Sequence, residues 1–108
     1  MIIFLGDLHG EFHLLPMLLK NVPKDATIIQ VGDFGLYPDR KELWDAAWDE
    51  LQLENPILFI DGNHEYHPLF KGIDAPTEIW KGAKFIPRGT IMTLENKIFG
   101  FLAEIPET

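Results

Sequence analysis

Three short apolar runs occur in the first 60 residues of the chain, and each is followed at once by a polar stretch that contains glycine. Residues 1–5 are apolar without interruption, which is typical of a parallel strand covered on both faces. Residues 27–31 are rich in β-branched side chains, and residues 57–60 form a third apolar run. We therefore predict three buried strands.

The segments between these runs have the periodicity of helices. Residues 11–21 place four leucines on one helical face, and Pro16 falls in the first turn, where proline is tolerated. Residues 38–54 carry a broader apolar stripe that includes Trp44 and Trp48, which we expect to pack in the core and not to stack on bases. The order β-α-β-α-β predicts an α/β fold with a parallel, helix-covered sheet.

The pattern changes in the last third of the chain. Short strand-like runs lie at residues 77–80, 84–86, 90–94 and 98–102, and turn residues separate them. The last two runs are predicted to form a hairpin through residues 95–97. We expect residues 1–108 to form a single domain.

Charge and composition narrow the classes of function. The 108 residues carry 17 acidic and 9 basic side chains, for a net charge of −8, so the surface gives no general attraction for nucleic acid. No apolar stretch approaches the roughly 20 residues that span a bilayer, and the chain has no cysteine. We expect a cytoplasmic protein without a membrane role.

The polar residues that could carry chemistry follow the three predicted strands. Because the carboxyl ends of parallel strands meet at one edge of the sheet, these residues should line a common pocket. Oxygen and imidazole ligands together are typical of Mn, Fe, Zn or Ni sites and not of a purely oxygen-lined Ca site. A carboxylate on the middle loop can bridge two cations, and two such cations can clamp a phosphoryl group. The candidates are Asp7, His9, Asp33, Asn63, His64 and Glu65.

These residues stand in three ordered motifs, Gly-Asp-Leu-His-Gly at residues 6–10, Gly-Asp at 32–33 and Gly-Asn-His-Glu at 62–65. With each motif placed after a strand, the chain resembles the calcineurin-like metallophosphoesterase family. The resemblance implies a four-layer α/β/β/α sandwich, of which this chain would be the N-terminal part. It also implies hydrolysis of phosphomonoesters or phosphodiesters, small molecules or nucleotides among them, at two divalent metal ions, of which we favour Mn.

The resemblance also implies a role for each residue. Asp7 and His9 would bind the first metal, Asp33 would bridge both metals, and Asn63 would bind the second. His64 would contact the phosphate and protonate the leaving group as the catalytic residue. Glu65 would lie behind the ligands and orient one of them.

The sequence departs from the family pattern in two places. The family completes its site with a later Gly-His and a Gly-His-x-His, whereas no histidine follows His67 here, so the domain is expected to be incomplete at its C-terminus. A fragment, a short protein completed by association and a degenerate module all fit this observation. The second motif also lacks a close acidic residue, which leaves the roles of Asp39 and Arg40 open. His13 and His67 match no motif.

Three functions compete on these grounds. The first is metal-dependent phosphoester hydrolysis, and the second is a non-catalytic module of the same fold that binds metal or phosphate weakly and acts through a partner. A receiver-like Mg switch ranks last because it gives His9 no role. We also expect self-association, because a sheet that ends near residue 102 would leave an open edge and the apolar side chains of Phe99 and Phe101.

Overall fold

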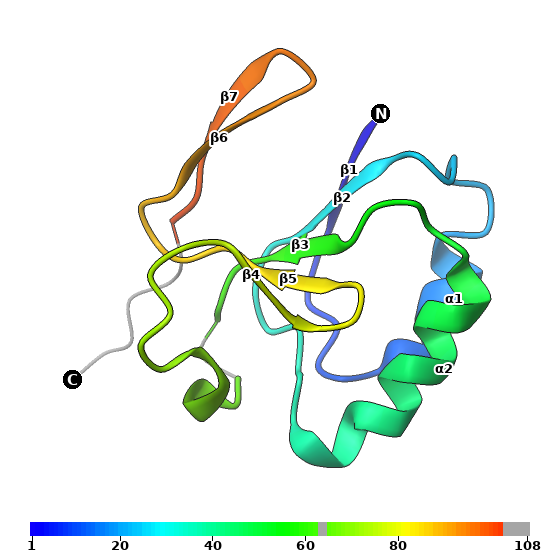
Figure 1. Ribbon diagram of the computed structural model, residues 1–108. Coiled ribbons are helices and arrows are strands. Elements are labelled where there is room, and N and C mark those ends of the chain that lie inside the picture. The colour runs from blue at the N-terminus through cyan, green and yellow to red at the C-terminus, as the bar shows by residue number, and fades with distance from the viewer. Residues whose placement is uncertain (63–64, 103–108) are drawn as a thin grey trace.

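A five-stranded sheet forms the centre of the computed structural model, whose described residues are 1–62 and 65–102 (Figure 1). The strands are β1 (Ile2–Leu5), β2 (Thr27–Gln30), β3 (Ile57–Phe59), β4 (Thr77–Trp80) and β5 (Ala83–Phe85), in the spatial order β1-β2-β3-β5-β4. Neighbouring strands from β1 to β5 run parallel, and only β4 is antiparallel to its neighbour. The predicted α/β fold with a parallel βαβαβ start is therefore confirmed.

Two α-helices lie together on one side of this sheet (Figure 1). Helix α1 (Leu15–Leu18) follows a 3-10 turn at Phe12–Leu14, and helix α2 (Lys41–Leu51) follows a 3-10 turn at Pro38–Arg40. None of the helices in residues 1–62 and 65–102 has the length and the apolar character that crossing a bilayer requires.

The first helical segment is much shorter than predicted. The sequence indicated a helix over residues 11–21, but the 3-10 turn and a single α-turn replace it. A 3-10 turn has about 3.0 residues per turn, so it shifts the phase of the residues that follow. Leu15 and Leu19 are buried as expected, whereas Leu18 is 53% exposed, and its placement on the apolar face was wrong.

Helix α2 supplies the aromatic centre of the core. Trp44 is fully buried and donates a hydrogen bond from Nε1 to the carbonyl oxygen of Lys81, at 2.9 Å. Its ring packs edge-on against Phe12 and Phe34, with centroids 5.2 and 5.4 Å away. Trp48 stacks on Trp44, so both tryptophans pack in the core as predicted.

The opposite face of the sheet is covered by a hairpin of β6 (Ile91–Leu94) and β7 (Lys97–Gly100) (Figure 1). Glu95 and Asn96 form its two-residue turn, with φ of 49° and 67°, and the predicted hairpin is confirmed. The expectation of an exposed Phe101 was wrong, because that side chain is 5% exposed and packs with Ile29, Leu58 and Ile86.

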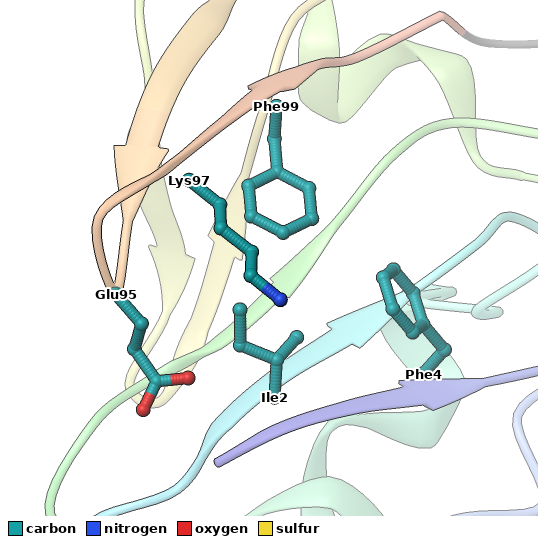
Figure 2. Close-up of a pocket in the computed structure, with 5 residues that line it drawn as sticks. All are labelled: Ile2, Phe4, Glu95, Lys97 and Phe99. Carbon is teal, nitrogen blue, oxygen red and sulfur yellow. The ribbon is translucent and has the colours of Figure 1, made fainter.

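The hairpin covers this face only in part. A hollow of about 590 Å³ remains between β1 and the hairpin, lined by Ile2, Phe4, Glu95, Lys97 and Phe99 (Figure 2). Phe4 is 59% exposed there. The prediction that residues 1–5 form a strand covered on both faces was therefore wrong, because the hairpin leaves the face that carries Phe4 partly open. Among the described strands β1 pairs only with β2, so it also lies at one end of the strand order.

Candidate metal centre

The loop after β1 brings Asp7 and His9 to the surface at the carboxyl edge of the sheet. The side chains of both residues are at least half exposed, while Leu8 between them is buried in the core. His9 has a φ of 49°, in the left-handed region that residues with a side chain rarely occupy. This backbone turn lets the two side chains lie on the same side, with His9 Nε2 3.6 Å from Asp7 Oδ2.

The loop after β2 is joined to the first loop by main-chain hydrogen bonds. The N–H groups of Leu8 and His9 donate to the carbonyl oxygen of Asp33, at 3.3 and 2.8 Å, and Gly10 donates to Phe34 at 2.9 Å. Asp33 itself has a φ of 53°. Unusual backbone angles of this kind persist where the surrounding structure enforces them, and they concentrate at functional sites.

Two glycines permit the close approach of the loops. A Cβ atom at Gly35 would lie 2.3 Å from the nitrogen of Gly10, and one at Gly62 would lie 2.3 Å from Oδ1 of Asp33. Both distances are far below van der Waals contact, so no larger residue fits at either position without moving a loop. Gly35 and Gly62 are therefore required by the packing of the loops at the site.

Glu65 joins the loop after β2 to the loop after β3. Its buried carboxylate accepts hydrogen bonds from the backbone N–H groups of Phe34 and Gly62, both at 3.1 Å, and of Gly35 at 2.9 Å. Burial raises the pKa of Glu65, against the opposing effect of the three N–H donors, and the nearby charge of Asp33 raises it further. The carboxylate thus fixes the backbone that follows Asp33 and joins it to Gly62.

Gln30 performs a similar task between the first and second loops, and the sequence reasoning missed it. It is fully buried at the end of β2, donates from Nε2 to the carbonyl oxygens of Gly6 and Gly32, and accepts from the N–H of Gly32. The one indication in the sequence is a polar residue within a run of β-branched apolar residues. A buried amide in such a run needs partners, and here they are the loops that carry the ligands.

The result is a cluster of possible metal ligands from two loops. One ligand atom from each of Asp7, His9 and Asp33 lies within 4.8 Å of the other two. Two carboxylates and an imidazole suit a transition-metal cation, and the residues present therefore fit a divalent metal ion. The predicted residues Asn63 and His64 lie outside the described residues, although Gly62 and Glu65 on either side of them lie against the loop of Asp33.

The remaining candidates are placed around this cluster. Arg40 is half-buried and lies against the first loop, since a Cβ at Gly10 would be 3.5 Å from its Nε, whereas Asp39 is exposed. His13 is exposed, with Nδ1 3.5 Å from a carboxylate oxygen of Glu11. His67 lies in the 3-10 turn His67–Phe70, with its ring centroid 6.4 Å from that of Phe70. None of these four belongs to the ligand cluster found among the described residues.

Comparison with known proteins agrees with this geometry. A family model described as calcineurin-like phosphoesterase matches residues 1–105. Searches of curated proteins and of solved structures gave no match. The family match spans nearly the whole chain and all three strand-end motifs, including the residues that the fold brings together. The chain belongs to the calcineurin-like phosphoesterase family.

Proposed function

We propose that this protein hydrolyses phosphomonoesters or phosphodiesters of small molecules or nucleotides at a divalent metal centre, with Mn as the favoured metal. Membership of a phosphoesterase family supports the reaction class. The observation that carries the proposal is the convergence of Asp7, His9 and Asp33, whose ligand atoms lie within 4.8 Å of one another.

The proposed roles are those that the family resemblance implies, and the contacts among the described loops support them. Asp7 and His9 would hold one cation, Asp33 would share its carboxylate between two, and Asn63 would supply an amide oxygen to the second. Bound metal ions would supply Lewis acidity and a water of lowered pKa. His64, next to Asn63 on the third loop, would protonate the leaving oxygen. Glu65 contributes by fixing the two loops that carry these residues.

The test is turnover of bis(4-nitrophenyl) phosphate, an activated phosphodiester, by the full chain with added Mn²⁺, measured beside Asp33→Asn. Asp25→Asn is a matched control, because Asp25 carries the same charge and precedes β2, at the end of the strands opposite to the candidate site. We expect metal-dependent turnover in the parent and the control, and at least a hundredfold loss in Asp33→Asn.

Two results would contradict the proposal. Equal turnover in Asp33→Asn would show that the cluster is not the catalytic centre. A folded parent that shows no turnover with Mn, Fe, Zn or Ni would instead favour the non-catalytic module that binds metal or phosphate.

A further inference from the structure

Arg88 reaches the carboxyl edge of the sheet from a fourth strand. It follows β5, which is the parallel neighbour of β3, and the pairing continues where the N–H of Ile86 donates to the carbonyl oxygen of Phe59 at 2.8 Å. The loop that carries Arg88 therefore lies at the same edge as the loops of Asp7, His9 and Asp33. β2 and β5 are separated by one strand, which corresponds to roughly 10 Å at the usual strand spacing.

A buried carboxylate holds the guanidinium in place. Nη2 of Arg88 donates to Oδ2 of Asp61 at 3.1 Å, and the Asp61 side chain is only 10% exposed. Oδ1 of Asp61 is buried and accepts no hydrogen bond from the described part of the chain. The Arg88 side chain stays 41% exposed. A guanidinium has five N–H donors, so it keeps donors that a ligand in solvent can reach.

Arg88 also lines an open groove of about 420 Å³. One wall is apolar and includes Phe70, Ile73 and Pro87. The carboxylates in the groove are Asp61, which is paired with Arg88, and Asp74, which is exposed at the rim. Arg88 places a positive charge in the lining of this groove, although the chain as a whole has a net charge of −8.

We propose that Arg88 binds the inner phosphate of a nucleoside diphosphate while the terminal phosphoryl group is held at the metal centre, so that the site prefers nucleoside diphosphates to nucleoside monophosphates. Water attacks the terminal phosphorus, the P–O bond of the phosphoanhydride breaks, the nucleoside monophosphate leaves with its phosphate on Arg88, and the terminal group is released as inorganic phosphate. The planar fork of arginine suits two phosphate oxygens, and its pairing with Asp61 restricts its rotation before the substrate arrives. The apolar wall beside it suits the uncharged remainder of such a substrate. The inference rests on the proposed function and extends it from phosphoesters to a phosphoanhydride, because it places the terminal phosphoryl group at the Asp7, His9 and Asp33 cluster.

The first test compares kcat/KM for a nucleoside diphosphate and the matching monophosphate, which differ by one phosphate group. The diphosphate should be favoured at least tenfold by the parent chain. Arg88→Met should remove that preference mainly through a higher KM for the diphosphate. Lys20→Met is the matched control, because it removes one positive charge from an exposed site near the opposite edge of the sheet and should leave the preference unchanged.

A second variant allows the test to be made if Arg88→Met does not fold. Arg88→Met alone leaves the buried charge of Asp61 unpaired, which is costly, whereas Asp61→Asn combined with Arg88→Met removes both charges. The double variant should lose the diphosphate preference to the same extent. An unchanged preference in a folded variant, or no preference in the parent, overturns the proposal.

A binding measurement separates this proposal from the proposed function. If the parent hydrolyses neither nucleotide nor bis(4-nitrophenyl) phosphate, the proposed function fails, and calorimetric titration with pyrophosphate and Mg²⁺ decides the role of Arg88. Binding that weakens at least tenfold in the Arg88 variants and not in Lys20→Met supports the anion site. Equal binding in all variants, or no binding to the parent, overturns it.

Discussion

At the scale of single residues, the candidate site depends on backbone positions that few residue types tolerate. His9 and Asp33 both have left-handed φ angles, and the two loops that carry them are joined by the carbonyl oxygen of Asp33. Gly35 and Gly62 allow the contacts between loops, because each would otherwise place a Cβ inside another loop. The close packing of the loop backbones therefore determines whether the ligand side chains come together.

Replacement of Gly35 tests this packing. Gly35→Ala should lower the free energy of unfolding by about 2–5 kcal/mol, because the residue has a φ of 90° and its Cβ would overlap Gly10. Gly72→Ala is the matched control, since Gly72 has a φ of 79° and nothing within 4 Å of the added atom. It should cost about 1–2 kcal/mol by the backbone angle alone. Equal losses in urea denaturation would disprove the packing argument.

Glu65 provides a second test at this scale. Two oxygens of Glu65 accept three backbone N–H groups, and Gln offers one oxygen and an NH₂ group that would face a donor. Glu65→Gln should therefore lower the free energy of unfolding by about 1–3 kcal/mol and weaken metal binding. Glu50→Gln, at an exposed position of α2, should change neither quantity measurably. A stable Glu65→Gln with parent metal affinity would show that the carboxylate does not organise the loops.

At the scale of elements, the sequence predicts where the strands lie better than it predicts which of their side chains are buried. The parallel strands, helix α2 and the hairpin all follow from periodicity and turn residues that act locally. The exposure of Phe4 and the burial of Phe101 depend on which part of the sheet the hairpin covers, and that is a tertiary contact. The same reason explains why Gln30 was missed, since its partners lie on two separate loops.

The hairpin turn gives a prediction for a single element. Asn96 has a φ of 67°, which glycine adopts without penalty and a β-branched residue resists. Asn96→Gly should raise the midpoint of thermal unfolding slightly, while Asn96→Val should destabilise the protein by about 1–2 kcal/mol. Thr93→Val, within β6, is the control for the apolar character of valine at a position that already holds a β-branched residue. A stabilising effect of Asn96→Val would mean that the turn has another geometry.

At the scale of the whole molecule, the two faces of the sheet are unequal. The helical face buries the larger apolar cluster, whereas the hairpin leaves Phe4 and the hollow beside Phe99 open to solvent (Figure 2). Exposed apolar surface next to an edge strand favours association with a second copy. We expect sedimentation velocity to show a concentration-dependent dimer that Phe4→Lys weakens at least tenfold. A parent chain that stays monomeric at high concentration would contradict this expectation.

The proposed metal centre depends on Asp7, His9 and Asp33, which two loops far apart in sequence bring together. Calorimetric titration with Mn²⁺ of the parent, Asp33→Asn and the control Asp25→Asn tests it most directly. We expect saturable binding in the parent and the control, and an affinity at least tenfold lower in Asp33→Asn. Equal affinity in all three chains, or no binding to the folded parent, would contradict it.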